Sequence, residues 1–289
     1  PGPVPALRHF IVHGESEGGH NASPSHVGMH DIFNVHMRPF EAGIKAGAGD
    51  VMTTYNLVDG IPCVITPLVE EVLRGRWKWK GMVVADAWAI SSLVPWGFAE
   101  TLGEAAAAAV KAGTDFCCWE GEQFKQGLRE AFAEGLLTQE EFNVPIRRIL
   151  REKFEVGLFE HPYIDDVTKA ARIMGCRKHR DMALELARES LVLLKNDGST
   201  LPLKSMKRLA VVGPNADSMH NQIGDYTAPQ RPGDVITARA GFEQLSRNYG
   251  FQVLHARGCG VRSLKRDGLA EALDAAGKAD AVVVVLGGS

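Results

Sequence analysis

Asp86 is the residue of this sequence whose position points most clearly to chemistry. It follows the apolar run at 81–85 and therefore stands at the carboxyl end of a predicted buried strand. In a parallel α/β barrel, reacting groups lie at this end of the strands, where the following loops form the active site. An aspartate in this place is also an ordinary N-cap for the next segment, so the pattern leaves both interpretations open.

Arg8 and His9 belong to another apolar segment, and a histidine beside a cation suits hydrogen bonding to an anionic or polyhydroxyl ligand. From this segment alone, a core histidine with satisfied hydrogen bonds is the more ordinary interpretation. Tyr55 and Asn56 close a further apolar run and offer polar contacts at the same edge of the predicted sheet. An aromatic packing residue and a turn residue would produce the same pattern.

Tryptophan is concentrated in the first half of the chain, and Trp88 lies two residues after Asp86. Its position makes Trp88 the best candidate for a platform on which a sugar ring stacks, although tryptophan is also common as packing. Asp115, in the segment AGTDFCC, sits in a place similar to that of Asp86, but there we favour a structural role. The five tryptophans are Trp77, Trp79, Trp88, Trp96 and Trp119.

The elements that must position these side chains alternate between short apolar runs and helical stretches. This alternation predicts an α/β fold with parallel strands. Four such units fit half of a closed eight-fold barrel or a small doubly wound sheet, and the long polar segment at 13–28 favours the barrel. The predicted strands are 7–12, 51–55, 82–86 and 114–118, and the predicted helices are 29–47, 66–76 and 101–112.

The α/β pattern restarts in the second half of the chain. A helical stretch at 122–160 is followed by an exposed connector at 161–175 and a helix at 178–195. Strands are then predicted at 208–212, 251–256 and 281–286, the last one buried, with helices at 240–248 and 266–277. The pattern predicts the later part of a (β/α)8-type barrel at 1–165, a linker helix and connector at 166–200, and the opening of a second α/β sheet at 201–289.

Composition excludes several classes of protein. The chain has 289 residues, 45% hydrophobic residues, 23% charged residues and a net charge of −3, which excludes disordered, collagen-like and coiled-coil proteins and gives no basic footprint for nucleic acid. No apolar run is long enough to span a bilayer. The five cysteines form neither a disulfide scaffold nor a metal motif, and Cys117 and Cys118 are interpreted as core strand residues. The glycine fingerprint of a nucleotide-binding dehydrogenase is absent.

Taken together and in order, eight motifs make the chain resemble glycoside hydrolase family 3, over essentially its whole length. The motifs are RHFIVHGESEGG at 8–19, RPFEAGIKAGAGDVMTTYNLVDGIPC at 38–63, LRGRWKWKGMVVADAW at 73–88, AGTDFCC at 112–118, RRILREKFEVGLFEHPY at 147–163, ALELARESLVLLKNDGSTLPL at 183–203, VVGPNAD at 211–217 and GDYTAPQ at 224–230. The resemblance implies a (β/α)8-type barrel, an α/β sandwich and an active site between them.

The resemblance also implies a mechanism, retaining hydrolysis of β-D-glucosides or β-D-xylosides through a covalent glycosyl-enzyme, without cofactor or metal. Asp86 matches the nucleophile of the family's strand-end motif. Arg8 and His9 match a Lys–His pair that binds sugar hydroxyls, and Met52 and Tyr55 match an M-x-x-Y-N motif beside the nucleophile. Trp88 is expected to contribute to substrate binding. The expected partner is a small-molecule or oligosaccharide β-glycoside, with no nucleic acid and no membrane.

The sequence departs from the family pattern in ways that bear on activity. Arg8 replaces the usual lysine, a planar fork in place of a point donor, and Ala87 stands where an aromatic residue is common. In the resembling subgroup the acid/base glutamate lies beyond the third strand of the sandwich, so none is assigned, although Glu15, Glu17 and Glu120 are carboxylates near strand ends. We therefore expect the 289-residue chain alone to be an inactive fragment, with exposed strand edges.

Two other functions compete with this interpretation. One is a β-N-acetylhexosaminidase of the same family, since the sequence shares H-F-x-x-H-G, ending at His13 and Gly14, with that branch. The other is a non-catalytic carbohydrate-binding fragment. The sugar and the oligomeric state stay undetermined, as does the compartment, which is secreted, periplasmic or cytoplasmic. The loop at 224–230 either reaches over a neighbouring domain's site or is a plain surface loop.

Overall fold

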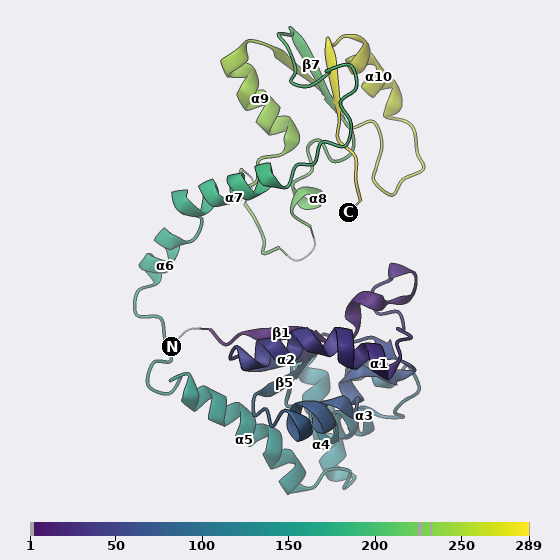
Figure 1. Ribbon diagram of the computed structural model, residues 1–289, viewed down its shortest axis with the longest axis vertical. Coiled ribbons are helices and arrows are strands. Elements are labelled where there is room, and N and C mark those ends of the chain that lie inside the picture. The colour runs from purple at the N-terminus through teal and green to yellow at the C-terminus, as the bar shows by residue number, and fades with distance from the viewer. Residues whose placement is uncertain (1–2, 225–226, 232, 289) are drawn as a thin grey trace. The chain divides into compact units, whose positions relative to one another are not determined.

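The computed structural model describes residues 3–224, 227–231 and 233–288. The chain forms two compact units, Pro1–Met174 and Gly175–Ser289, which are described separately (Figure 1). Asp225 and Tyr226 of the 224–230 loop lie outside the described residues, so the structure does not bear on the prediction for that loop.

The first unit contains a parallel sheet in which each predicted apolar run supplies one strand. The strands follow the order β1-β2-β5-β6, and all neighbouring pairs are parallel. A separate antiparallel hairpin, β3-β4, turns at Asp59 and Gly60, which both have positive φ. The strand bounds are β1 (Ala6–Phe10), β2 (Asp50–Thr53), β3 (Leu57–Val58), β4 (Ile61–Pro62), β5 (Met82–Ala85) and β6 (Phe116–Cys117).

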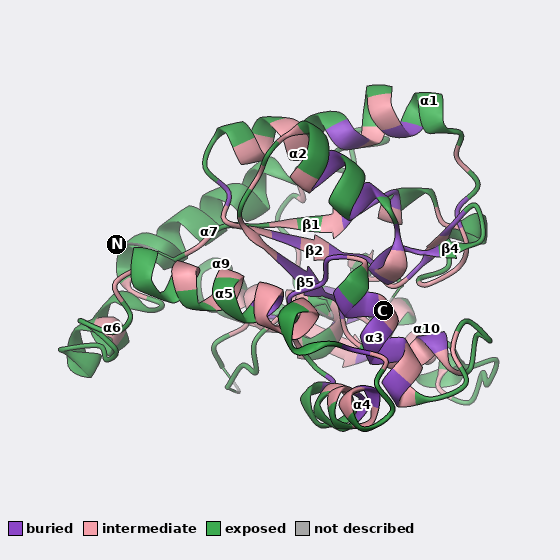
Figure 2. Ribbon diagram, turned by 90° about the horizontal axis from the view of Figure 1, so that it is seen from below, coloured by how far each residue is buried: buried purple, intermediate pink, exposed green. Residues whose placement is uncertain are grey.

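Alternation along the strands assigns the two faces of this sheet different surroundings. Val51 and Val83 are fully buried and pack against residues of the surrounding helices. The residues that follow them along the two strands, Met52 and Val84, face the other way, because successive strand side chains point to opposite sides. The register places Arg8 beside Met52 and Met52 beside Val84 on that second face. Figure 2 shows the buried residues gathered between this sheet and the helices.

The helices that cover the sheet begin at sequence-encoded caps. Thr101 accepts a hydrogen bond from the backbone of Glu104 at the start of α3, and Thr138 and Glu141 form a reciprocal capping box at the start of α5. The predicted helix at 29–47 is continuous but includes a π-helical segment. The helical bounds are α1 (Met29–Asp31), η3 (Ile32–His36), α2 (Met37–Lys45), η5 (Val69–Arg76), α3 (Leu102–Lys111), α4 (Gly121–Ala133), α5 (Gln139–Glu155) and α6 (Val167–Ile173).

Two predictions for this unit were wrong in detail. The helical stretch expected at 122–160 is two helices, α4 and α5, because Gly135 adopts a positive φ and ends the first. The connector expected at 161–175 contains α6, which is capped by the Asp166 carboxylate accepting hydrogen bonds from the backbone of Thr168 and Lys169. Cys117 is buried in β6 as expected, whereas Cys118 follows the strand and is half-buried.

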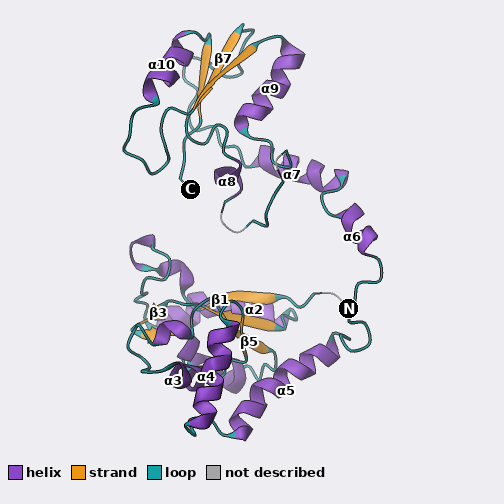
Figure 3. Cartoon of the chain, turned by 180° about the vertical axis from the view of Figure 1, so that it is seen from behind, coloured by secondary structure: helices purple, strands orange, loops and turns teal. Residues whose placement is uncertain are grey.

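The second unit is a three-layer arrangement around a parallel sheet of order β8-β7-β9 (Figure 3). Leu209 and Val211 of the central strand pack toward Phe242 of α9, and Ala210 and Val212 pack toward Ala275 of α10. The bounds are β7 (Arg208–Val212), β8 (Gln252–Ala256), β9 (Ala281–Val284), α7 (Arg177–Glu189), α8 (Met219–Ile223), α9 (Ala238–Tyr249) and α10 (Leu269–Gly277).

Three expectations for this unit need correction. The third strand was expected to be buried, but Val282 and Val284 are 43% and 57% exposed, so one of its faces is uncovered. The helix expected at 178–195 ends at Glu189, and α8 was not anticipated. None of the helices in the described part of the chain combines the length and the apolar character that crossing a membrane requires.

Candidate active site

Asp86 lies directly after β5 and is 5% exposed. Its Oδ1 accepts a hydrogen bond of 2.8 Å from the backbone N–H of Ala87. Its Oδ2 is buried and, within the described part of the chain, has no hydrogen-bond partner. A buried carboxylate oxygen without a partner is energetically costly and signals a functional constraint. The local fold therefore anchors one oxygen of Asp86 and leaves the other available.

Arg8 and His9 reach this oxygen from the neighbouring edge of the sheet. Nε2 of His9 lies 3.3 Å from Asp86 Oδ2, and a guanidinium nitrogen of Arg8 lies 3.9 Å from it. Arg8 also donates to His9, with its Nε 2.6 Å from His9 Nε2 and a second guanidinium nitrogen in contact with the same atom. The structure thus brings together the three residues that the sequence singled out from two separate strands.

The electrostatics of this group favour a neutral imidazole beside a carboxylate and a cation. Burial, followed by the nearby Arg8 and His13, lowers the pKa of His9 from 6.5 to about 4, although Asp86 acts in the opposite direction. His9 is therefore uncharged at neutral pH, and Arg8 supplies the positive charge next to Asp86. A neutral imidazole and a guanidinium fork are both suited to hydrogen bonding with hydroxyl groups.

Met52 and Tyr55 border the same edge of the sheet. Met52 is half-buried on β2, between Arg8 and Val84 in the strand register. Tyr55 follows β2, and its hydroxyl donates a hydrogen bond of 2.9 Å to Oδ1 of Asn21 in the polar 13–28 loop. The ring of Tyr55 also packs edge-on against His13, with 5.6 Å between ring centroids. Tyr55 thus connects the strand end to the loop.

Trp88 lies beyond Asp86 in a turn and is 62% exposed. Its backbone adopts a left-handed conformation with φ of 57°, which is unusual for a bulky residue. The exposed ring is accessible for stacking. In contrast, Trp77 and Trp79 pack against the core, so they are structural residues.

The other carboxylates near strand ends have structural partners. Asp115 is buried and pairs with Arg74 at 3.0 Å and Arg148 at 2.9 Å. Burial raises the pKa of Asp115 although both arginines act to lower it. Glu120 is 1% exposed and accepts backbone hydrogen bonds from Ile90 and Ser91, each of 2.9 Å. The structure thus gives Asp115 the structural role favoured from the sequence.

Glu15 and Glu17 do not converge on Asp86 either. Both lie on short 3₁₀ turns of the 13–28 loop and are exposed. Glu17 lies 3.1 Å from Nε2 of His26, an exposed contact on the same loop.

Three residues near the site were not identified as functional candidates from the sequence: Ser25, Thr54 and Cys118. His13, which also lies here, was singled out only for the β-N-acetylhexosaminidase alternative. Ser25 and Thr54 are fully buried polar residues, and Thr54 lies within the M-x-x-Y-N motif, which was the available signal. The thiol of Cys118 donates to the carbonyl of Ala85, and burial followed by the charge of Asp86 raises its pKa. Ser25 and Cys118 carry no comparable signal for a place beside Asp86.

A cavity of about 410 Å³ lies beside this group and includes Arg8, His9, His13 and His36 in its lining. Its mixed polar and apolar walls are of a kind that binds small molecules. Among the residues that the structure describes, no group of three or more histidines, cysteines or carboxylates is arranged to hold a metal ion.

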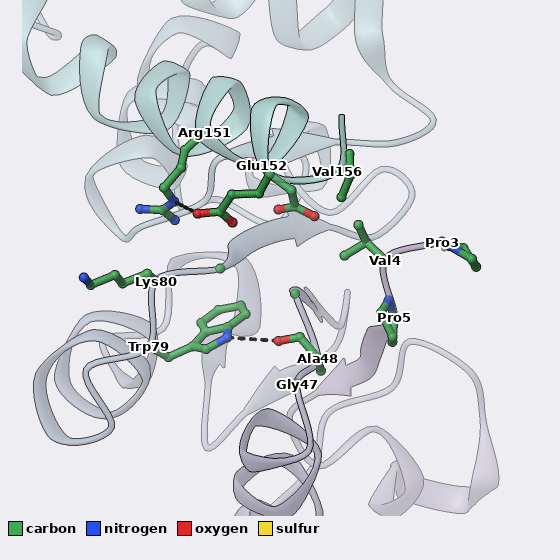
Figure 4. A pocket seen from close by; sticks show the side chains of 13 residues that line it. Pro3, Val4, Pro5, Gly47, Ala48, Trp79, Lys80, Arg151, Glu152 and Val156 are labelled. Carbon is green, nitrogen blue, oxygen red and sulfur yellow. Dashed lines mark hydrogen bonds and ion pairs between the residues drawn. The ribbon is translucent and has the colours of Figure 1, made fainter. Parts of the chain in front are cut away.

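A second carboxyl group lies at the opposite end of the strands. Figure 4 shows Glu152 of α5 among the residues that line a cavity of about 430 Å³ near the starts of β1, β2 and β5. Burial and a hydrogen-bonded Asp50 carboxyl raise the pKa of Glu152 to about 7, and burial also raises the pKa of Asp50. This pair is remote from Asp86 in the strand register.

Each of the two units matches a domain model of a known protein family. Residues 2–152 match the model of the glycosyl hydrolase family 3 N terminal domain, and residues 191–289 match the C-terminal domain of the same family. Together the two matches include most of the chain, in the order that the motifs predict. The second unit and the first therefore correspond to successive domains of one family.

Similar curated proteins carry glycosidase names. A periplasmic β-glucosidase of Salmonella typhimurium is 34% identical over 98% of this chain and 40% of its own length. A β-xylosidase of Formosa agariphila is 31% identical over 99% of this chain and 41% of its own length. The chain thus spans about two fifths of the length of these relatives.

Solved structures agree with the sequence comparisons. A β-glucosidase from Erythrobacter marinus is 31% identical and superposes with a TM-score of 0.85, covering 99% of this chain and 41% of that protein. The resemblance in sequence motifs, the two family matches and this structural similarity lead to the same assignment. The chain belongs to glycosyl hydrolase family 3.

Proposed function

We propose that this chain is part of a retaining β-glycosidase that releases terminal, non-reducing β-D-glucosyl or β-D-xylosyl residues. The observation that carries the proposal is Oδ2 of Asp86, a buried carboxylate oxygen with no described hydrogen-bond partner, flanked by Arg8 and His9. The names of the similar proteins support the choice of sugar. This chain spans only 40% of the length of its β-glucosidase relative. The activity is therefore proposed for the full-length protein that contains this chain, which is called the longest polypeptide below.

In the proposed first step, Oδ2 of Asp86 bonds to the anomeric carbon while the bond from that carbon to the leaving oxygen breaks. A general acid gives the leaving oxygen its proton. In the second step, water attacks the same carbon, the bond to Asp86 breaks, and the conjugate base takes the proton from the water. Water and two carboxyl groups complete this reaction, so it needs no cofactor.

Each neighbouring residue has a proposed role in this reaction. The hydrogen bond from Ala87 fixes Oδ1 of Asp86 and so orients Oδ2. Arg8 and His9 bind hydroxyl groups of the sugar next to the nucleophile, with Met52 and Tyr55 bordering the same edge. Trp88 provides an exposed aromatic face for the sugar or aglycone. No acid/base is assigned, because Glu120 and Asp115 are both occupied by structural hydrogen bonds.

The β-N-acetylhexosaminidase alternative rests on His13 acting as a proton donor and acceptor. Acid/base histidines are commonly oriented by a carboxylate at the second ring nitrogen. In this structure Nδ1 of His13 lies 2.8 Å from the hydroxyl of Thr54 instead. This geometry favours the glucosidase or xylosidase proposal.

A mechanism-based label tests the proposal directly. The longest polypeptide is incubated with 2-fluoro-glucoside and 2-fluoro-xyloside inhibitors, digested, and analysed by mass spectrometry. A label on the peptide that contains Asp86, absent from the peptide that contains Asp115, supports the assignment. A label on a different carboxylate, or an inverted first product by NMR, contradicts it. A panel of aryl glycosides, including N-acetylglucosaminides, then separates the three sugar specificities.

A further inference from the structure

A chain of buried side-chain hydrogen bonds lies behind the candidate active site. His13 Nδ1 lies 2.8 Å from Thr54 Oγ1, and Thr54 donates a hydrogen bond of 2.6 Å to Asn56 Oδ1. Asn56 Nδ2 donates to Ser25 Oγ at 2.9 Å, and Ser25 donates to the carbonyl of Val12 at 3.3 Å. Ser25, Thr54 and Asn56 are fully buried. The four side chains come from the 13–28 loop and the end of β2.

The direction of each hydrogen bond in this chain is fixed by its neighbours. The carboxamide of Asn56 has its nitrogen 3.4 Å from the carbonyl of Leu57. A carbonyl only accepts, so this contact requires the nitrogen of Asn56 on that side and its oxygen toward Thr54. An amide oxygen also only accepts, and the single hydroxyl hydrogen of Thr54 is therefore used in the bond to Asn56.

This accounting determines which nitrogen of His13 carries a hydrogen. Because Thr54 has no second hydrogen to donate, its hydroxyl oxygen accepts from His13, and Nδ1 must be protonated. In the neutral imidazole, Nε2 then has a free lone pair. The Thr54 contact occupies Nδ1 alone, and His13 is half-buried in the lining of the 410 Å³ cavity, which Arg8 and His9 also line. The His13 ring also packs on His9, with centroids 4.4 Å apart.

We propose that Thr54 is a positioning residue that holds neutral His13 in the Nδ1–H tautomer and so presents Nε2 as an acceptor for a sugar hydroxyl. The contact between Nε2 and a sugar hydroxyl rests on the proposed function. The assignment of the Nδ1–H tautomer does not. The His13 ring, held in this way, also supports the face of His9, which contacts Asp86. The substrate class that this acceptor selects is a glycoside with a free hydroxyl at the position that faces the cavity lined by His13.

The tautomer is measured on the 289-residue chain without substrate. Long-range ¹⁵N–¹H correlation spectra of histidine-labelled protein, recorded at a pH where His13 is neutral, distinguish the two tautomers by the shifts of the ring nitrogens. The His13 signals are assigned from a His13→Gln variant. We expect the Nδ1–H tautomer in the wild type and in Thr54→Ser, and a mixture of tautomers in Thr54→Val. The Nε2–H tautomer in the wild type overturns the proposal even if Thr54→Val does not fold.

The sugar contact is tested by comparing how Thr54 variants of the longest polypeptide change KM and how they change kcat. Loss of one hydrogen bond of this kind corresponds to about a tenfold change. We expect Thr54→Val to raise KM for the preferred aryl glycoside in proportion to the lost fraction of the Nδ1–H tautomer, up to about tenfold, with a smaller change in kcat, and Thr54→Ser to keep KM near the wild-type value. An unchanged KM alongside an altered tautomer would overturn the sugar contact. An inactive wild type would overturn the proposed function alone, because the spectra need no substrate.

Discussion

The contact between Asp86 Oδ2 and His9 Nε2, at 3.3 Å, is close but is not a hydrogen bond. Nε2 of His9 is already the acceptor for the guanidinium of Arg8, so it offers no hydrogen to the carboxylate. The proximity brings a neutral ring, a cation and a carboxylate together, while no residue in the described part of the chain donates to the carboxylate oxygen. In the proposed reaction that oxygen is the nucleophile, and a nucleophile is more reactive when no donor occupies its lone pair.

Replacing Asp86 by asparagine is expected to abolish hydrolysis by the longest polypeptide, by about three orders of magnitude or more, and to leave the fold intact. Asparagine keeps an oxygen that accepts from Ala87, and it removes a buried charge whose second oxygen has no partner. Its unfolding midpoint in urea should therefore equal or exceed that of the wild type. Asp86→Ala should be equally inactive. Activity above a tenth of the wild-type value in either variant would remove Asp86 from the mechanism.

Glu120 is predicted to stabilise the turn after Asp86 by accepting from two backbone donors. Glu120→Ala leaves the N–H groups of Ile90 and Ser91 unpaired in the interior, and we expect a loss of about 3 kcal/mol of unfolding free energy. Glu120→Gln keeps one accepting oxygen and should lose about half as much. Urea denaturation of the 289-residue chain measures both. A loss under about 0.5 kcal/mol for the alanine variant would contradict the capping role.

Asp115 is predicted to be essential for stability. Removing it leaves Arg74 buried without its ion-pair partner, and the loss of one partner from a buried ion pair costs about 3–5 kcal/mol. Burial already lowers the pKa of Arg74 to about 10, which shows how strongly this site disfavours an uncompensated charge. Asp115→Ala should therefore unfold at much lower urea concentration than the wild type. The matched control is Asp181→Ala, which removes an exposed pair with Arg177 and should scarcely move the midpoint.

The pair formed by Asp50 and Glu152 is predicted to make stability depend on pH. The pKa of Glu152 is about 7 in the folded chain against an ordinary value of 4.5, so the folded state binds more protons than the unfolded state between these values. Its stabilising contribution is present near pH 4.5 and is lost as the pH rises through 7. Arg151, which lowers the pKa of Glu152, and Glu155, which raises it, face the same carboxyl.

Urea midpoints recorded from pH 4.5 to 7.5 should therefore fall for the wild type and fall less for Glu152→Gln. Glu122→Gln is the matched control, because the Lys125 side chain lowers the pKa of that exposed carboxyl and no titration is expected in this range. Equal slopes for the wild type and Glu152→Gln would show that another group sets the pH dependence.

Two substitutions of Trp88 are predicted to affect substrate binding equally and folding stability differently. Its left-handed backbone favours glycine over any residue with a Cβ, by about 1 kcal/mol. Trp88→Gly should thus be more stable than Trp88→Ala by about that amount, while both variants raise KM to a similar extent through the lost aromatic face. The comparison of the two variants isolates the backbone effect because neither has the indole. An unchanged KM in both variants would show that the ring does not contact substrate.

Local patterns predicted most of the strands and helices in this structure. The alanine-rich run at 104–112 forms α3, and the apolar run at 208–212 forms β7. The β3-β4 hairpin was missed although Asp59 and Gly60 are a recognised signal for its turn. The exposure of β9 could not be predicted, because an apolar run does not reveal whether a second layer covers both of its faces.

The candidate site was predictable only in part. Asp86 was found from its place after an apolar strand, whereas the partnership of Arg8 and His9 with it came from the family resemblance. The hydrogen bonds that join His13, Thr54 and Ser25 could not have been predicted, because these residues are separated in sequence and carry no motif that links them. Their association depends on how the 13–28 loop folds over the end of β2.

The two carboxyl systems at the ends of the sheet make the chain favourable for engineering. Asp86 follows the last residue of β5, and Asp50, the first residue of β2, is in register with Met82, four residues before Asp86. This spacing is about 13 Å along the strands, a distance at which substitutions usually act additively. Substitutions of Glu152 could therefore shift the pH at which the folded chain is most stable. Substitutions around Asp86 could change the rate of hydrolysis, and neither set should alter the effect of the other.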